Sequence, residues 1–297
     1  MSWRVALIDS CGAWPGAVAA AAFVDEGVVV AEDTATRGSG AAVGFAGADA
    51  DVSAGVRMVQ RRATGADATG HGTRVARILS QGGAEFELLL GQVFLGKAPA
   101  SAAAVAAALD WAVAGGADLI HMSLGLAADR AVLAAAVLRA VGAGCVVVAS
   151  APARGGVVYP AAYRGVIRGT GDARCGPGEL SCLGPGFFGG CPRWVVSGAE
   201  VDAARASGAA DASAGAGASG GADAGGGASV GVGAGTGAGI SAGASVGAAW
   251  VTRSILNEPT RRDAPEVIGL LTKKASYRGP ERKGRRLDAI AIDTPSV

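Results

Sequence analysis

The stretch Gly-His-Gly-Thr-Arg-Val-Ala, residues 70–76, is the part of the chain from which the rest can be interpreted. It follows a loop rich in Gly, Ala and Thr at residues 63–69, and it begins a segment whose apolar residues have helical spacing: Val75, Ile78 and Leu79. His71 is therefore expected at a loop-to-helix junction, between two glycines that let another backbone or a substrate come close. Such a histidine predicts either a general base or a simple helix cap. A base would require a nucleophile and an orienting acid elsewhere in the chain.

Apolar runs and helical patterns alternate on both sides of His71. Short apolar runs predict strands at residues 3–8, 27–31, 87–95, 118–125 and 145–149, and helical spacing predicts helices at residues 100–114, 127–141, 246–256 and 264–274. Residues 151–192 are rich in Gly and Pro and are expected to be irregular, with a further short strand at 194–197. This order predicts an α/β fold, a doubly wound and mainly parallel sheet with helices on both faces.

Length and composition allow one large domain or two small ones, and we expect a single domain over residues 1–297. Half of the residues (50%) are hydrophobic and 17% are charged, which allows a large core, and the net charge of +1 gives no strong field for nucleic acid or a membrane. A segment of Gly, Ala, Ser and Asp at about 201–240 cannot bury enough surface to order itself and is expected to be a flexible insertion. Asp9 breaks the N-terminal apolar run, so we expect no signal peptide and a cytoplasmic location.

No pattern in the chain predicts a cofactor or a metal. A Gly-x-Gly-x-x-Gly match at residues 215–220 has no strand before it and no helix pattern after it, and no Gly-Lys-Ser/Thr phosphate loop occurs. The spacing of Cys175, Cys182 and Cys191 does not match a zinc site, and the five cysteines are expected to be free thiols. We therefore expect no cofactor.

Candidates for the acid and the nucleophile occur at opposite ends of the chain. Asp9 directly follows the first predicted strand, where α/β folds place working side chains, although an aspartate there also suits a turn. Ser245 precedes a predicted helix whose N-terminus favours a developing anion, although a helix cap is the simpler interpretation. The pentapeptide Gly-Ala-Ser-Val-Gly occurs twice, at 227–231 and 243–247, and Ser245 is preferred over Ser229 because a helix pattern follows it.

The resulting order of Asp, His and Ser is that of subtilisin-like serine proteases, and the sequence around each residue resembles a motif of that family. The segments that carry the resemblance are residues 5–10, 70–76 and 243–248, with 121–125 similar to the strand that pairs with the substrate backbone and 287–289 similar to the closing element. This chain has Cys11, Arg74 and Ala244 where the family usually has Gly, His and Thr.

The resemblance implies a catalytic triad of Asp9, His71 and Ser245. It also implies that an extended peptide lies along Ser123, Leu124 and Gly125 by strand addition. The expected activity is that of a serine endopeptidase that works through an acyl-enzyme.

The chain departs from the family at the oxyanion hole. The family places an Asn side chain shortly after the strand predicted at 145–149, but Ala153 stands there, and Asn257 is the only Asn in the chain. Loss of one such donor typically costs about 10²–10³-fold in rate. The backbone N–H of Ser245 and the side chain of Arg154 are the remaining candidate donors. We therefore expect either a slow, dedicated protease or a pseudoprotease that binds or escorts peptides without cleaving them.

The expected substrate is a protein or a peptide. A cytoplasmic protease without a propeptide suits selective processing better than general proteolysis. In its size, its expected cytoplasmic location and its unusual sequence at the oxyanion hole, the chain is similar to the subtilisin-like proteases that trim a leader in quinohemoprotein amine dehydrogenase biogenesis. That similarity implies a peptide leader of a maturing enzyme subunit as the partner. A Rossmann-type cofactor enzyme is a third alternative, which the lack of an ordered glycine fingerprint disfavours.

Overall fold

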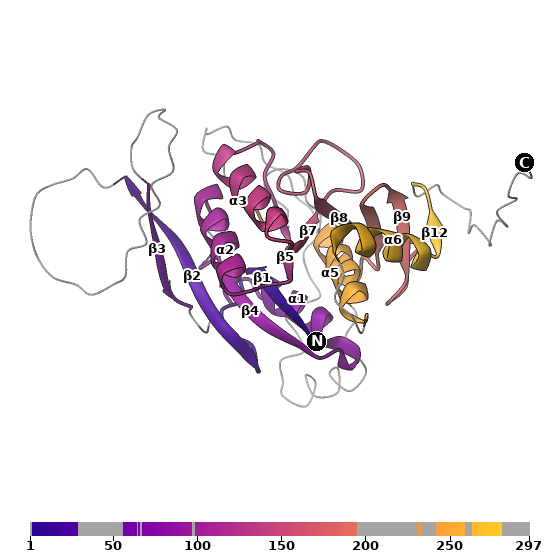
Figure 1. Ribbon diagram of the computed structural model, residues 1–297, viewed down its shortest axis with the longest axis horizontal. Coiled ribbons are helices and arrows are strands. Elements are labelled where there is room, and N and C mark those ends of the chain that lie inside the picture. Colours follow the sequence, from indigo (N-terminus) through magenta and orange to yellow (C-terminus); the bar gives the residue numbers. More distant parts are fainter. Residues whose placement is uncertain are drawn as a thin grey trace, which may run out of the picture.

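The computed structural model describes residues 2–28, 56–63, 65, 67–96, 99–194, 231–232, 242–258 and 263–280. These residues contain a ten-stranded sheet whose central strands, from β8 to β2, all run parallel (Figure 1). Antiparallel pairs join β9 to β10 and β2 to β3. In order of pairing the strands are β12 (Tyr277–Arg278), β9 (Leu180–Gly184), β10 (Phe187–Gly190), β8 (Val166–Gly171), β7 (Val146–Ser150), β5 (Leu119–Met122), β1 (Trp3–Asp9), β4 (Phe86–Gln92), β2 (Ala17–Val28) and β3 (Val56–Arg62).

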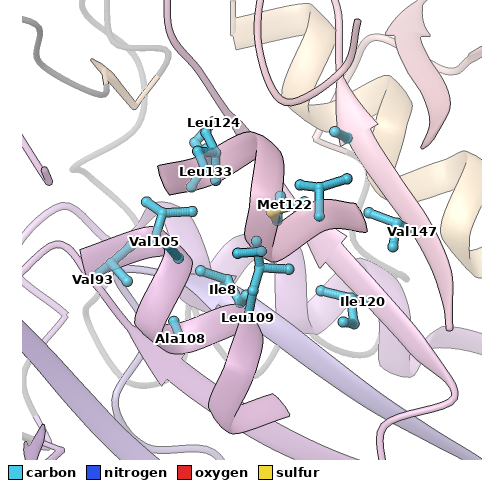
Figure 2. Packing of buried hydrophobic residues seen from close by; sticks show 14 of the residues in the cluster. Ile8, Val93, Val105, Ala108, Leu109, Ile120, Met122, Leu124, Leu133 and Val147 are labelled. Carbon is cyan, nitrogen blue, oxygen red and sulfur yellow. The ribbon is translucent and has the colours of Figure 1, made fainter. Parts of the chain in front are cut away.

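One face of the sheet is covered by α2 (Ala102–Ala114) and α3 (Ala131–Gly142). Successive side chains of a strand point to opposite faces, so only alternate residues of β1 reach this core. Ile8 is one of them, and Figure 2 shows it beside Leu109 of α2, with Ile120 of the neighbouring strand close by. The strands are buried on both faces, which explains why they read as continuous apolar runs in the sequence.

The other face is covered by α1 (His71–Ser80), α5 (Ala242–Leu256) and α6 (Ala264–Lys274). Val5 and Leu7, the alternate residues of β1, belong to this second core. The chain is therefore an α/β protein with a mainly parallel sheet and helices on both faces, and the predicted fold class is confirmed.

Local sequence accounts for the ends of the best-predicted helices. The Ser101 hydroxyl caps α2 by accepting from the backbone N–H of Ala104 at 3.1 Å, and Gly116 follows the helix with a φ of +74°. At α6, Asp263 and Glu266 form a capping box in which each side chain accepts from the backbone N–H of the other residue. The helix predicted at 264–274 is confirmed.

The prediction of an irregular segment at 151–192 is wrong, because β8, β9 and β10 lie there. Two of these strands, β8 and β10, give a weak strand signal because they carry glycines where α5 packs against them. A Cβ added to Gly169 would lie 2.6 Å from the Cα of Ala248, and one added to Gly190 would lie 2.7 Å from the carbonyl oxygen of Gly247. Only glycine fits at this distance, so a β-branched residue cannot stand at these two positions.

The N-terminal part of the sheet also differs from expectation. The strand predicted at 27–31 begins at Ala17, as β2, and its residues beyond 28 lie outside the described part of the chain. Alanines make up most of the first half of β2, and alanine gives a weak strand signal. Of the strand predicted at 194–197, Trp194 is described and is not in a strand, and the other residues lie outside the described ranges.

Of the insertion predicted at 201–240, the structure describes β11 (Gly231–Val232), which pairs antiparallel with β6 (Leu124–Gly125). The short 3-10 helix η1 (Gln81–Gly83) follows α1 directly. In the described ranges, no helix combines the length and the apolar character that a bilayer span requires.

Candidate active site

Asp9 and His71 meet at the carboxyl end of the parallel strands. Asp9 is the last residue of β1, and His71 is the first residue of α1. The imidazole Nδ1 lies 2.9 Å from Oδ1 and 3.0 Å from Oδ2 of the carboxylate, and both side chains are buried. Donation from Nδ1 to the carboxylate leaves a lone pair on Nε2. Among the described residues, Nε2 has no hydrogen-bond partner, so it is available to another group.

Ser10 connects this pair to the surrounding backbone. Its hydroxyl donates to Oδ1 of Asp9 at 3.1 Å, and it accepts from the Thr69 hydroxyl at 2.8 Å and from the backbone N–H of Gly72 at 3.0 Å. The Thr69 hydroxyl oxygen in turn accepts from the backbone N–H of His71 at 3.1 Å. One fully buried hydroxyl thus ties the end of β1 to the first turn of α1, a role that nothing in the sequence indicated.

The glycines on either side of His71 are required by the geometry. Gly70 has a φ of +63°, in the left-handed region that favours glycine. A Cβ on Gly72 would lie 2.5 Å from the backbone nitrogen of Cys11 and 3.0 Å from Oδ1 of Asp9. The first turn of α1 can approach the end of β1 this closely because residue 72 has no side chain. The close backbone approach that the sequence predicted at His71 is confirmed.

Asp67 organises the loop that leads into α1. Its Oδ1 accepts from the backbone N–H of Gly70 at 2.8 Å, and its Oδ2 accepts from the backbone N–H and the hydroxyl of Thr73 at 2.8 and 2.6 Å. Burial acts to raise the pKa of Asp67, but the hydrogen bonds that it accepts, chiefly those from Thr73, outweigh this effect, so the pKa lies below its usual value. The ionised carboxylate therefore holds the loop that presents His71.

Trp194 and Arg74 cover the outer side of His71. The indole of Trp194 meets the imidazole edge to face, with ring centroids 5.9 Å apart and an interplanar angle of 89°. The guanidinium of Arg74 lies 5.6 Å from the Trp194 ring centroid, at cation–π distance. Arg74, which stands where the family often has a second histidine, thus packs on the residue that restrains the imidazole. Trp194 was not predicted as a site residue.

Ser245 reaches the same edge of the sheet from α5. Its hydroxyl is fully buried and donates to the backbone carbonyl of Ser123 at 3.4 Å. Ser123 directly follows β5, and the pairing of Met122 with Ile8 brings Ser123 level with Asp9. The structure thus joins Asp9 to His71 and places Ser245 on the neighbouring strand end, without a hydrogen bond from Ser245 to Nε2 among the described residues. Ser245 was predicted to precede the helix, which is wrong, because α5 begins at Ala242.

The position of Ser245 depends on how closely α5 packs on β8. A Cβ on Gly247 would lie 1.9 Å from the carbonyl oxygen of Thr170 and 2.4 Å from the backbone nitrogen of Gly171. On the other side of the contact, Gly169 lies against Ala248. The helix that carries Ser245 is therefore held against the sheet by backbone contact, which leaves little freedom for it to shift.

His121 links the segment at Ser123 to the same helix. Its Nε2 lies 2.6 Å from the hydroxyl oxygen of Ser123, and its Nδ1 lies 2.8 Å from the hydroxyl oxygen of Thr252 in α5. Complete burial lowers the pKa of His121 to about 4, so the imidazole is neutral at neutral pH. A neutral imidazole donates from one nitrogen and accepts at the other, which suits two hydroxyl partners. This network was not predicted.

The segment predicted to bind substrate lies beside Ser245, and part of its backbone is already paired. Gly125 pairs with Gly231, and Leu124 pairs with Val232, in the antiparallel ladder of β6 and β11. Leu126 exchanges two backbone hydrogen bonds with Tyr159, of 2.7 and 2.9 Å. The backbone at Leu124–Gly125 therefore accepts an added strand, which here comes from the same chain.

The remaining predicted site residues lie apart from these contacts. Ala153 and Arg154 are exposed in the loop that follows β7, and their role at an oxyanion stays a prediction. Asn257 follows the last residue of α5, at the opposite end of the helix from Ser245, so it does not replace the missing Asn. Ser229 and residues 287–289 lie outside the described part of the chain.

The cysteines carry no sign of a metal site in the described ranges. All five are free, and burial raises the pKa of Cys175 to about 12, so this thiol stays protonated. Within the described residues, no group of three or more His, Cys, Asp or Glu is placed to hold a metal ion.

Comparison with known proteins finds similarity to proteases among solved structures. No family model and no curated protein matches the chain. Similar structures are the nisin leader peptidase NisP from Lactococcus lactis (20% identity, 36% of this chain and 42% of that chain, TM-score 0.31) and the self-cleaved protease domain of PatA (20%, 57% and 57%, 0.36). A third is the psychrophilic subtilisin-like protease Apa1 from Pseudoalteromonas sp. AS-11 (19%, 58% and 37%, 0.38).

The chain matches less than two thirds of the length of each of these proteins. The more specific similarity to the leader proteases of quinohemoprotein amine dehydrogenase biogenesis stays a prediction. The structural neighbours are proteases, and one of them is described as subtilisin-like.

Proposed function

We propose that the chain is a subtilisin-like serine endopeptidase that processes a protein or peptide substrate, such as the leader of a maturing enzyme subunit. Asp9, His71 and Ser245 form its triad. The observation that carries this proposal is the buried Asp9–His71 pair at the same sheet edge as Ser245, with no partner for its Nε2 among the residues that the structure describes. An aspartate that orients an imidazole in this way supports a general base.

The reaction begins when the Ser245 hydroxyl turns from the Ser123 carbonyl toward Nε2 of His71. Nε2 takes the proton as Oγ bonds to the scissile carbonyl carbon, and the Asp9 carboxylate stabilises the resulting imidazolium. The imidazolium then protonates the leaving amine as the C–N bond breaks, which leaves an acyl-enzyme. Nε2 next deprotonates a water that attacks the ester, and the returned proton restores the Ser245 hydroxyl.

The substrate backbone lies along Ser123, Leu124 and Gly125. The pairing of β6 with β11 supports this placement, because an extended segment already pairs with this backbone and a substrate strand would take the place of β11. The neutral His121 fixes the Ser123 side chain to α5 and so keeps this segment in register with Ser245.

Arg154 stabilises the oxyanion in place of the family's Asn. The backbone N–H of Ser245 does not take this role in a helix that begins at Ala242, because the N–H of the fourth helical residue bonds within the helix. The loss of that Asn predicts turnover slower by about 10²–10³-fold than with a complete oxyanion hole. A slow enzyme suits selective processing of one or a few substrates.

Labelling with a fluorophosphonate probe, followed by peptide mapping, tests the proposal. The label is expected on Ser245 and is expected to disappear in His71→Ala, because the hydroxyl then lacks its base. The matched control is Ser254→Ala, which removes another buried hydroxyl of α5, one that donates to the Trp250 carbonyl. Label on Ser229 would show that the other copy of the pentapeptide supplies the nucleophile, and no label on folded protein would contradict the proposal.

A pseudoprotease that binds or escorts a peptide is the second candidate function. It is favoured by one observation: the Ser245 hydroxyl is fully buried and bonded to the Ser123 carbonyl instead of His71. Ser245→Ala distinguishes the two functions. An endopeptidase loses product formation with this variant and still binds the peptide, whereas an escort protein keeps its full function.

A further inference from the structure

A cavity of about 440 Å³ lies at the far ends of the two helices that carry His71 and Ser245. It is bounded by the last turn of α1, by η1 and by the last turns of α5. Its walls include Trp14 and Trp250, two arginines (Arg77 and Arg253) and Asn257. None of the described residues that line it is acidic. The cavity is therefore cationic, and it is separate from the Asp9–His71 pair.

Arg253 is the most unusual residue of this cavity, because its charge is buried and has no counter-ion among the described residues. The residue is 6% exposed, and none of the ion pairs in the described ranges involves its guanidinium. Burial lowers its pKa, and no charged neighbour opposes this effect. A buried charge of this kind costs several kcal/mol unless it is paired.

Its contact with α1 accounts for only part of its hydrogen-bonding capacity. One guanidinium nitrogen donates to the carbonyl of Leu79 at 3.3 Å, which places a cation favourably at the C-terminus of α1. A guanidinium has five N–H donors, and a carbonyl has no net charge, so this bond neither uses the donors nor balances the charge. The other terminal nitrogen lies against Gly82, where a Cβ would come within 2.2 Å of it. Glycine at that position leaves the guanidinium its space.

Trp250 supplies an apolar wall beside this charge. It is 4% exposed and lines the cavity, and its indole Nε1 is itself sealed from solvent, so its N–H does not reach the cavity. Trp250 and Arg253 are three residues apart and so share one face of α5.

We propose that this cavity binds a carboxylate attached to a flat apolar group. The fork of the Arg253 guanidinium matches the two oxygens of a carboxylate. The rings of Trp14 and Trp250 supply the apolar walls for the rest of the ligand. A free aromatic acid and the C-terminal carboxylate of a peptide that ends in an aromatic residue both meet this description.

Calorimetric titration of the full chain tests the site with benzoate, its neutral isostere benzamide and inorganic phosphate. The peptide Ala-Ala-Phe is titrated with a free and with an amidated C-terminus, which distinguishes the two sources of carboxylate. Benzoate or the free peptide is expected to bind at millimolar concentration or below, and benzamide and the amidated peptide are expected to bind at least ~10-fold more weakly. Absence of carboxylate binding, or a preference for phosphate, would overturn the proposal.

Two variants locate the binding. Arg253→Met keeps the apolar stem and removes the charge, and Arg253→Lys keeps a charge and removes the fork. Both are expected to weaken carboxylate binding, the first by ~10-fold or more. Arg139→Met is the matched control, because Arg139 pairs with Asp110 on the surface of α3, away from the cavity. Wild-type affinity in Arg253→Met, with a folded circular dichroism spectrum, would overturn the assignment, and Arg253→Lys keeps the test decisive where Arg253→Met does not fold.

Discussion

Replacement of Gly72 by Ala tests whether the Asp9–His71 pair depends on the close approach of α1 to β1. The added Cβ would lie 2.5 Å from the backbone nitrogen of Cys11, 2.8 Å from its Cβ and 3.0 Å from Oδ1 of Asp9. Ordinary contact requires about 3.5 Å, so the first turn of α1 has to move outward by about 1 Å. Overpacking of this kind costs about 1–3 kcal/mol, and the better helix propensity of Ala returns at most ~1 kcal/mol. We expect a net loss of about 1–2 kcal/mol in the free energy of unfolding.

The same displacement is expected to reduce the reactivity of Ser245. A misplacement of about 1 Å costs about 10²-fold in rate, so the fluorophosphonate labelling rate should fall by that factor. Gly269→Ala is the matched control, because it lies inside α6 and nothing lies within 4 Å of an added Cβ. The control should gain about 0.5–1 kcal/mol and label at the wild-type rate. Urea unfolding measures the first effect. Wild-type stability and labelling in Gly72→Ala would refute the close-approach argument.

Two further predictions concern His121 and β11. The pKa of His121 is about 4 in the folded chain against 6.5 for an ordinary histidine, so its contribution to stability is fully present above 6.5 and is lost as the pH falls toward 4, by up to ~3 kcal/mol. Between pH 4 and 6.5, the free energy of unfolding measured with urea should therefore depend less steeply on pH in His121→Gln than in the wild type. Equal slopes would contradict the assignment. Val232→Pro should raise kcat/KM for a peptide substrate by ~5-fold relative to the control Val232→Ala. The reason is that proline weakens the β11 ladder that occupies the edge of β6. Equal kcat/KM values for the two variants would show that β11 does not compete with substrate.

Much of the fold could be predicted because its signals are local. The core strands are buried on both faces and read as apolar runs, as in the Val146–Ser150 strand β7. Helix α6 was predicted to the residue because Asp263 and Glu266 mark its start within four positions of the sequence. By contrast, β8 and β10 owe their glycines to a helix that follows them by more than fifty positions in the sequence, so no local pattern announces them.

The residues of the candidate site also fall into two groups, those with a local signal in the sequence and those without one. His71 could be predicted because its two glycines flank it directly, and Asp9 because it ends an apolar run. The roles of Ser10, His121 and Trp194 arise from contacts between distant segments. His121, for example, meets Thr252, which lies 131 positions away. A serine beside an aspartate or a lone histidine in a strand is too common a pattern to predict such a contact.

The choice between the two copies of Gly-Ala-Ser-Val-Gly is finally a question of packing. The copies are identical, so the pentapeptide alone does not decide which serine is the nucleophile. A nucleophile needs a rigid support, which must come from the residues around it. After the second copy come Ala248, Ala249 and Trp250, all buried, and Gly247 rests against the carbonyl of Thr170. Larger residues at Gly247 and Ala248 would give a stronger signal in the sequence, but they would also lift α5 from β8 and move Ser245 away from the sheet edge that holds His71. The low complexity that obscures this part of the sequence is therefore what allows the helix to approach the sheet.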